Sequence, residues 1–212
     1  PHVVLGVGGY ASGPVMLAAA FRGIPLAVFE PNAYPGLANR WIAPYVARAF
    51  VAFNEAVSCF AAGKAIVTGI PVRDEFFAVP PANHHAPFTV LVFGGSQGAR
   101  SLNCAVIEAL PQLDQTQSDA KPGLMLLHQT GQSEYNRVQE EVAKHSAPVE
   151  VFAFLDHIWE AFARADLVVC RAGAGTVAEL AAAGRAAIMI PFPAAANEHQ
   201  LRNAEALAKI GA

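Results

Sequence analysis

The sequence predicts an α/β fold built from parallel sheets with helices on both faces. Short apolar runs alternate with longer stretches of helical periodicity, so strands separated by helices should form βαβ units. Of the 212 residues, 54% are hydrophobic and only 15% are charged, as expected for strands that are buried on both faces. Gly-rich segments follow three of the strands, which places candidate ligand sites at strand ends.

The apolar runs and helical patterns predict alternating strands and helices along the whole chain. Strands are expected at residues 2–6, 26–29, 47–53, 65–68, 89–93, 124–128, 149–152, 167–170 and 187–190. Helices are expected at residues 14–22, 37–43, 99–110, 133–145, 157–165, 175–183 and 198–210.

We expect two domains with a boundary near residue 69. The segment Gly69-Ile70-Pro71-Val72-Arg73 interrupts the alternation, a polar stretch rich in proline follows at residues 79–87, and a new strand begins shortly afterwards. Residues 1–69 would form the later part of a first domain, and residues 70–212 would form a second domain. The chain lacks an initiator methionine and stops just after a helical pattern. We therefore expect an internal fragment in which the first domain and the last helices are incomplete.

Charge, cysteine content and hydropathy exclude several classes of protein. A formal net charge of -3 gives no basic footprint for a nucleic acid. The three cysteines form no CxxC pair, which argues against a zinc site or a disulfide framework and fits a reducing compartment. We expect no signal peptide. The longest apolar stretch, residues 15–29, is broken by Arg22 and Pro25 and falls short of the ~20 residues that span a bilayer.

A glycine-rich turn follows the strand expected at residues 89–93. The sequence Gly94-Gly95-Ser96-Gln97-Gly98-Ala99 connects that strand to a helix. Glycines let the backbone approach a ligand closely, and free N–H groups at a helix start favour an anion such as a diphosphate. The segment is neither a Walker A loop nor a full GxGxxG pattern. Taken alone, a plain tight turn is an equally good interpretation.

A second unit of the same kind strengthens the ligand interpretation. The strand at residues 167–170 leads into Arg171-Ala172-Gly173-Ala174-Gly175-Thr176 and then into a helix. Thr176 can cap this helix and touch a phosphate. Glu179 lies about one turn inside the helix, where a carboxylate can accept two hydrogen bonds from a ribose diol. Without the glycines, Glu179 would be interpreted as a helix-dipole partner. Beside this turn, ligand binding is the better interpretation.

A third unit, Gly6-Val7-Gly8-Gly9-Tyr10-Ala11-Ser12-Gly13-Pro14, lies in the first domain and is expected to face the second domain's site. The ordered set of segments resembles the MurG family, the UDP-N-acetylglucosamine–lipid I N-acetylglucosaminyltransferases of peptidoglycan synthesis. The matching segments are residues 4–14, 30–40 beginning Glu30-Pro31-Asn32, 68–73, 94–99, 154–156 and 170–179, His199-Gln200 and Asn203-Ala204. They follow the family's order from end to end, which is far more specific than any one of them.

The resemblance implies a GT-B fold, in which two Rossmann-like domains enclose a cleft and the second domain holds the donor. The implied substrate-binding residues are Asn32, Arg73, Ser96, Gln97, Leu155, Ala174, Gly175, Thr176, Val177, Ala178, Glu179, His199 and Gln200.

Most of these residues have a specific implied role. The resemblance assigns Arg73 and the backbone of Leu155 to the uracil, with Phe154 and Ile158 packed beside the base. It assigns Ser96 and the turn at residues 174–176 to the diphosphate, and Glu179 to the ribose hydroxyls. Gln200, with His199, would recognise the sugar hydroxyls, and Asn32 would reach the site from the first domain.

The implied chemistry is displacement of UDP from the anomeric carbon, with inversion, by a sugar hydroxyl. The transition state is oxocarbenium-like, and charge builds up on the leaving diphosphate. Backbone N–H groups and helix N-termini can stabilise that charge. The sequence contains no Asp-x-Asp pair, so we expect no metal and no other cofactor. The catalytic general base is unknown, since the family's candidate histidine lies in an N-terminal loop outside this chain.

The implied partners are UDP-N-acetylglucosamine, lipid I and the anionic inner-membrane surface, with no nucleic acid. The location would be the cytoplasmic face of the bacterial inner membrane, as a peripheral protein. Phe21 beside Arg22 is a candidate lipid contact, although a packing role is the preferred interpretation. Packing is likewise preferred to membrane contact for Trp41 and Tyr45.

Two other functions stay open. The chain could belong to another GT-B enzyme that uses a UDP-sugar, such as a glycolipid synthase or a UDP-N-acetylglucosamine epimerase. It could also be a nucleotide-sugar-binding module that needs a partner subunit.

Overall fold

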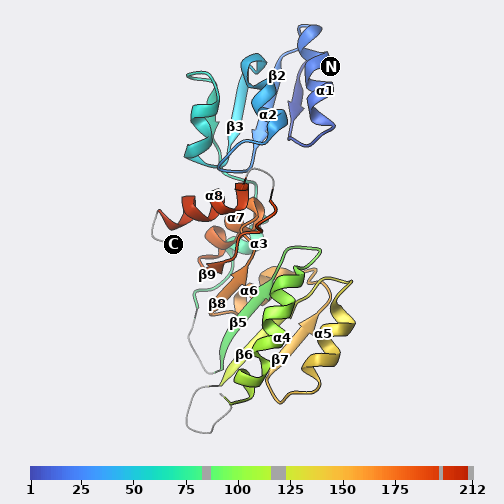
Figure 1. Cartoon of the computed structure of the whole chain (residues 1–212). Helices are drawn as coiled ribbons and strands as arrows, with labels where there is room; N and C mark the ends of the chain where they lie inside the picture. Colours follow the sequence, from blue (N-terminus) through green and yellow to red (C-terminus); the bar gives the residue numbers. More distant parts are fainter. Residues whose placement is uncertain (83–86, 116–122, 196–197, 210–212) are drawn as a thin grey trace. The chain divides into compact units, whose positions relative to one another are not determined.

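A computed structural model describes residues 1–82, 87–115, 123–195 and 198–209 (Figure 1). The chain falls into two compact units. The first consists of Pro1–Pro71, Ala172–Ala178 and Pro191–Ala212, and the second of Val72–Arg171 and Glu179–Ile190. Residues 83–86, within the proline-rich stretch, and the predicted helix end at residue 210 lie outside the described residues. No helix in the described ranges is long and apolar enough to cross a bilayer.

The first unit contains a parallel four-stranded sheet in the order β1-β2-β3-β4 (Figure 1). Its strands are β1 (Val4–Gly6), β2 (Leu26–Glu30), β3 (Arg48–Val51) and β4 (Ala65–Val67). Its helices are α1 (Ser12–Phe21), α2 (Leu37–Ile42), the short 3-10 helices η1 (Ala43–Tyr45) and η2 (Asn54–Cys59), and α8 (His199–Ala208). Apolar residues of α1 and α2, such as Met16 and Ile42, pack with Val28 and Val51 of the sheet to form the core.

The second unit contains a parallel five-stranded sheet in the order β7-β6-β5-β8-β9. Its strands are β5 (Phe88–Phe93), β6 (Leu124–Gln129), β7 (Val149–Phe152), β8 (Leu167–Cys170) and β9 (Ala186–Met189). Its helices are α3 (Asp74–Phe77), α4 (Arg100–Gln115), α5 (Tyr135–Val142) and α6 (Ile158–Arg164), and α7 (Ala174–Ala183) begins in the first unit and ends in this one.

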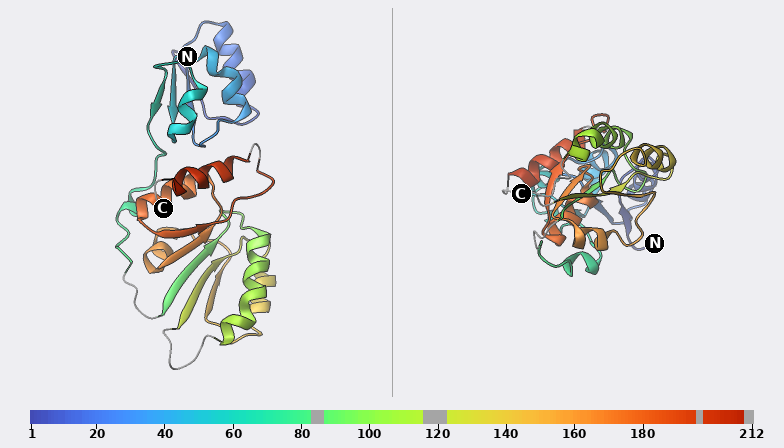
Figure 2. Two further views of the ribbon diagram at one scale, coloured as in Figure 1. Left: turned by 60° about the vertical axis from the view of Figure 1, so that its left-hand side comes forward. Right: turned by 90° about the horizontal axis from the view of Figure 1, so that it is seen from below.

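The five-stranded sheet is covered on both faces because successive strand residues point to opposite sides. Leu91 and Phe93 of β5 pack with Phe162 of α6 on one face. Val90 and Val92 of the same strand pack with Val106 of α4 on the other. The left view of Figure 2 shows α4, in green, lying along its face of the sheet. This arrangement confirms the predicted doubly wound, parallel α/β class.

All of the predicted strands and helices are present, with ends that shift by a few residues. Helix α3 and the two 3-10 helices were not predicted, since each is too short to show a period. Helix α4 continues past the predicted end at residue 110 to Gln115, although Pro111 lies inside it. Leu113 in this extension packs against the α4 face of the sheet, which gives the extra turn an apolar anchor.

Candidate functional site

The two strands that lead into the predicted ligand-binding turns are neighbours in the second unit. Strands β5 and β8 pair in parallel, with Phe93 opposite Cys170 at their last residues. Both strands therefore end at the same edge of the sheet, the carboxyl edge, where open α/β sheets bind ligands. The prediction that both glycine-rich turns start from one end of the sheet is confirmed.

The turn after β5 is closed at its base by its own backbone. The N–H of Gly98 donates to the carbonyl of Gly95 at 2.9 Å, which makes Ser96 and Gln97 the two central residues. Both central side chains are exposed. Gly95 and Gly98 have φ values of 90° and 74°, in the left-handed region that favours glycine. The turn thus presents two predicted substrate-binding residues at its tip, Ser96, which was predicted to hold the diphosphate, and Gln97.

The turn after β8 leads directly into α7, which begins at Ala174. The first N–H groups of a helix have no acceptor inside it and carry partial positive charge, so they suit an anion. Gly175 is exposed, and Thr176 and Ala178 are half-buried. Ala174 and Val177 are buried, and the N–H of Val177 already donates to Gly173 at 2.9 Å. Of the six predicted residues in this helix, Val177 is therefore the least suited to contact a ligand.

The structure brings Glu179 and Arg73 together, although they were predicted to contact different parts of a nucleoside. Nη2 of Arg73 lies 3.6 Å from Oε1 of Glu179. The Arg73 guanidinium also lies 4.6 Å from the centre of the Trp159 ring and 5.2 Å from that of Phe76. Burial raises the pKa of Glu179 above its ordinary value, and the charge of Arg73 opposes that shift. The Glu179 carboxylate is thus partly buried and lies beside the Arg73 guanidinium.

Replacing Glu179 by alanine is expected to weaken UDP binding at least tenfold. Two ribose hydrogen bonds of roughly 1 kcal/mol each would be lost. Calorimetric titration of the full-length protein with UDP measures the change, and Glu140→Ala, at an exposed residue of α5, is the control. Unchanged UDP affinity in Glu179→Ala would rule out the ribose role.

The connection from β7 to α6 places its predicted residues differently from one another. Phe154 is 51% exposed and Leu155 is half-buried against the core of the second unit, so both retain surface for a ligand. Ile158 is buried in that core beside Phe162. As a core residue, Ile158 can support the predicted base pocket only through its neighbours. Of the contacts predicted for the base, its direct contact is the least favoured by the structure.

Several buried polar residues of the second unit brace the turn after β5 and were not singled out in the sequence. The Gln129 side chain donates to the carbonyl of Gly95 at 3.0 Å. Asn103 donates to the carbonyl of Thr130 at 3.0 Å, and its Oδ1 lies 3.0 Å from Nε2 of His128. A run of polar residues at the end of a central strand was the available signal, because such residues seldom enter a core without a role.

Arg171 was quoted in the second turn without a role and proves to be a buried connector. Its guanidinium donates to Oγ of Ser101 at 2.5 Å and to the carbonyl of Ile190 at 3.0 Å. Burial lowers the pKa of this guanidinium. Arg171 thereby links the end of β8 to the first turn of α4 and to the end of β9.

In the first unit, the buried carboxylate of Glu30 holds the loop that carries Asn32. Its two oxygens accept hydrogen bonds from the Asn32 backbone at 3.0 Å, the Gly36 backbone at 3.0 Å and the Asn39 side chain at 2.8 Å. The Asn32 side-chain amide donates to the same carboxylate at 3.2 Å, and its oxygen accepts from Asn203 at 3.2 Å. Asn32 is therefore fixed in place by its neighbours.

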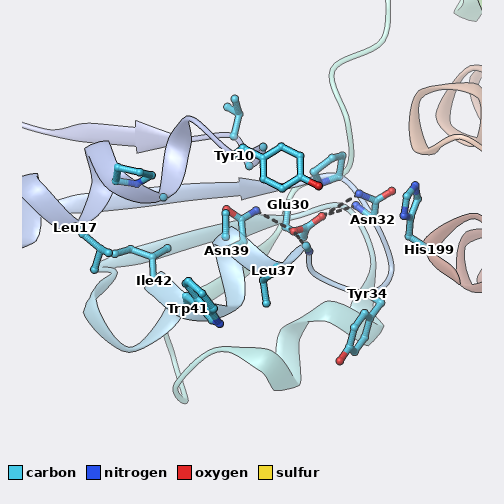
Figure 3. A pocket seen from close by; sticks show the side chains of 18 residues that line it. Tyr10, Leu17, Glu30, Asn32, Tyr34, Leu37, Asn39, Trp41, Ile42 and His199 are labelled. Atoms are coloured by element: carbon cyan, nitrogen blue, oxygen red, sulfur yellow. Dashed lines mark hydrogen bonds between the residues drawn. The ribbon is translucent and has the colours of Figure 1, made fainter. Parts of the chain in front are cut away.

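The same unit contains a cavity of about 690 Å³ (Figure 3). Its lining residues are Val7, Gly8, Gly9, Tyr10, Gly13, Pro14, Leu17, Glu30, Pro31, Asn32, Tyr34, Gly36, Leu37, Ala38, Asn39, Trp41, Ile42 and His199. The third glycine-rich segment thus forms part of a cavity wall. Of the two predicted sugar-reading residues, His199 lines this cavity, while Oε1 of Gln200 accepts a hydrogen bond from the Phe192 backbone at 2.9 Å.

The preferred packing interpretation of three aromatic residues is wrong. Phe21 is 90% exposed, Trp41 68% and Tyr45 61%. Each sits at or near the end of a short helix, where helical periodicity is a poor guide to the buried face. Ile42 and Val46, which directly follow Trp41 and Tyr45 in the sequence, are buried in the core of the first unit.

Curated relatives match the chain over its whole length. A protein of Syntrophotalea carbinolica is 50% identical over 213 residues, covering 100% of this chain and 58% of the relative. A protein of Myxococcus xanthus is 46% identical, covering 100% of this chain and 55% of the relative. Both are named UDP-N-acetylglucosamine–N-acetylmuramyl-(pentapeptide) pyrophosphoryl-undecaprenol N-acetylglucosamine transferase. The chain thus spans little more than half the length of these relatives, and the resemblance to the MurG family is confirmed.

Solved structures agree with the sequence matches. The crystal structure of Acinetobacter baumannii MurG has a TM-score of 0.80 and 35% identity, covering 99% of this chain and 58% of that one. A UDP-GlcNAc 2-epimerase from Neisseria meningitidis, bound to UDP-GlcNAc, has a TM-score of 0.60 at 13% identity, covering 98% of this chain and 62% of that one. At that identity the epimerase shows the fold alone. With the two parallel sheets, these similarities establish the GT-B fold class.

Two family models cover most of the chain. The N-terminal domain of glycosyltransferase family 28 matches residues 1–51, and the C-terminal domain of the same family matches residues 89–212. The second match alone covers more than half of the chain. This chain therefore belongs to glycosyltransferase family 28.

Proposed function

We propose that the protein to which this chain belongs transfers N-acetylglucosamine from UDP-N-acetylglucosamine to lipid I, with inversion at the anomeric carbon, and so makes lipid II for peptidoglycan. The observation that carries this proposal is the pairing of β5 with β8, which starts two glycine-rich turns from one sheet edge. Relatives at 43–50% identity that carry the name of this transferase support the same reaction.

The donor is proposed to bind through residues 70–212, which we take as the donor domain, with residues 1–69 as part of the acceptor domain. The N–H groups of Ser96 and Gln97 and of the first turn of α7 would bind the diphosphate. Glu179 would accept from the ribose hydroxyls, and Arg73 and Leu155 would bind the uracil. His199, Gln200 and Asn32 would bind the sugar.

These groups suit a reaction whose leaving group is a diphosphate. Negative charge develops on that group as the bond to the anomeric carbon breaks, and backbone donors already oriented toward it stabilise the charge without reorganising. A general base must take the proton of the acceptor hydroxyl. We place that base in a family loop outside this chain.

The acceptor and the membrane are proposed to meet the first unit. The cavity beside the third glycine-rich segment has aromatic walls, including Tyr10, Tyr34 and Trp41, which fits a glycosylated, partly apolar acceptor. The exposed Phe21 stands beside Arg22, a pair suited to an anionic lipid surface. A peripheral position on the cytoplasmic face of the inner membrane follows from an undecaprenyl-linked acceptor.

The reaction is tested by incubating the full-length protein with UDP-N-acetylglucosamine and lipid I and identifying the disaccharide product and its anomeric configuration. A β-linked N-acetylglucosamine on the muramyl residue is the expected product, since the donor is α-linked. Absence of transfer to lipid I, with transfer to a different acceptor, would favour another UDP-sugar enzyme of the same fold.

Chelation of divalent cations is expected to leave the transfer rate unchanged, because backbone donors and helix N-termini take the role that a metal has elsewhere. Initial rates with EDTA are compared with rates in added Mg²⁺. The control is a metal-dependent sugar transferase in the same buffers. A strict requirement for a divalent cation would contradict this assignment.

A further inference from the structure

We propose that Gln129 is a positioning residue for the diphosphate: its buried side-chain amide fixes the Gly95 carbonyl and thereby aims the Ser96 N–H at the ligand. This inference rests on the proposed function, because it assigns a role within the donor site. Gln129 is the last residue of β6 and is 2% exposed, so it acts through the turn rather than by touching the substrate.

The Gly95 carbonyl is held from two sides. It accepts the N–H of Gly98 at 2.9 Å and the side-chain amide of Gln129 at 3.0 Å. The carbonyl of Gly95 and the N–H of Ser96 belong to one planar, trans peptide group, so they point in opposite directions. Fixing the carbonyl toward the protein therefore fixes the N–H of Ser96 toward the solvent-exposed side of the turn.

Without these two hydrogen bonds, the Gly95–Ser96 peptide group could rotate, because glycine tolerates a wide range of backbone angles. Gly95 has φ 90°, and an added Cβ on it would meet no heavy atom within 4 Å in the described part of the chain. Packing therefore does not restrain the Gly95–Ser96 peptide. The two hydrogen bonds are what select one of its orientations, and Gln129 is the side chain among them.

The end of β6 is itself anchored, so that Gln129 has a firm base. The next residue, Thr130, has its carbonyl bonded to Asn103 of α4 at 3.0 Å and its Oγ1 bonded to the Phe152 carbonyl at 3.2 Å. Its carbonyl also packs against Gly98, where no Cβ could fit. The strand end and the turn thus form one rigid unit of backbone, and the Gln129 amide completes it.

A purely structural role for Gln129 makes a different prediction from a positioning role. Loss of a structural residue would weaken every ligand of the site. Loss of a positioning residue for the diphosphate would weaken the binding of UDP and leave the binding of uridine, which lacks phosphate, unchanged. The ratio of the UDP and uridine affinities therefore separates the two roles.

The first test is calorimetric titration of the full-length protein with UDP and with uridine. Gln129→Met keeps the length of the side chain and removes the donor. We expect its UDP affinity to fall about tenfold and its uridine affinity to stay within about twofold, since one aimed N–H to an anion is lost. Gln132→Met, at an exposed residue shortly after the end of β6, is the matched control and should bind both ligands like the wild type.

The second test uses Gln129→Glu. Its carboxylate cannot donate to the Gly95 carbonyl at pH 8, but the protonated acid has an O–H that can. The UDP affinity of Gln129→Glu relative to Gln129→Met should therefore rise as the pH is lowered. A ratio that stays flat with pH would overturn the proposal.

Two other results would also overturn it: Gln129→Met binding UDP like the wild type, or losing UDP and uridine affinity in parallel. Failure of the proposed function would look different. If the two turns did not bind a diphosphate, the wild type itself would bind UDP no more tightly than uridine. If only the proposed transfer failed, the wild type would still prefer UDP but would not glycosylate lipid I.

Discussion

Replacing Gly98 by alanine is expected to lower the free energy of unfolding by about 3 kcal/mol or more and to abolish tight binding of UDP. Gly98 has φ 74°, and a Cβ there would overlap the carbonyl of Thr130, which is backbone and cannot swing aside. Strain at a left-handed position costs roughly 1–2 kcal/mol, and pushing the turn at residues 95–98 away from the Thr130 backbone adds to that cost. The turn at residues 95–98 would move away from β6, and the Ser96 N–H would no longer point toward the diphosphate.

Gly95→Ala is the matched control for this change. It also has a positive φ, but its Cβ would enter space that is empty among the described residues, so only the roughly 1–2 kcal/mol of strain should appear. Urea unfolding of both variants measures the difference. If Gly98→Ala were no more destabilising than Gly95→Ala, the close contact between Gly98 and the Thr130 backbone would not exist.

Lowering the pH from 7 to 4 is expected to cost the protein about 3 kcal/mol of stability through His128 alone. Burial lowers the pKa of this ring from 6.5 to about 4. Below pH 6.5 the unfolded chain binds a proton at His128 that the folded chain does not, so stability falls as the pH falls toward 4 and is constant above 6.5. The geometry agrees, because Nε2 lies against Oδ1 of Asn103 while the buried Nδ1 has no hydrogen-bond partner among the described residues.

His128→Gln removes the titrating ring and keeps an amide that can donate to Asn103. Its unfolding free energy should change less between pH 7 and pH 4 than that of the wild type, as measured by urea unfolding at a series of pH values. His157→Gln, which removes an exposed histidine of the same unit, controls for the loss of a histidine as such. Equal pH dependence in His128→Gln and the wild type would show that the ring is not buried in neutral form.

The sequence predicts the fold well because its signals are local and strong. Strand β8 is predicted by four consecutive apolar residues. The turn after β5 is predicted by its three glycines, because several glycines so close together are typical of a tight turn. The positions of the two turns at one sheet edge also follow, since parallel strands share a carboxyl edge. The α3 helix, with four residues, gives no period from which to predict it.

The parts of the site that depend on distant contacts could not be predicted. Gln129 reaches Gly95 across 34 positions of sequence, and Arg171 reaches Ser101 across 70. Nothing local in the sequence marks such pairs. The ion pair between Arg73 and Glu179 escaped for the same reason, although each residue was proposed separately as a ligand contact. Exposure of Phe21 was also missed, because a helix end leaves few neighbours to reveal the buried face.

The central claim is that the backbone N–H groups of the two glycine-rich turns bind the diphosphate of the donor. Hydrogen exchange of the full-length protein, with and without saturating UDP, measures those amides directly. The account predicts slower exchange in peptides covering residues 94–99 and 173–177, and little change there with uridine. UDP that slows exchange elsewhere and leaves both of these segments unchanged would contradict it.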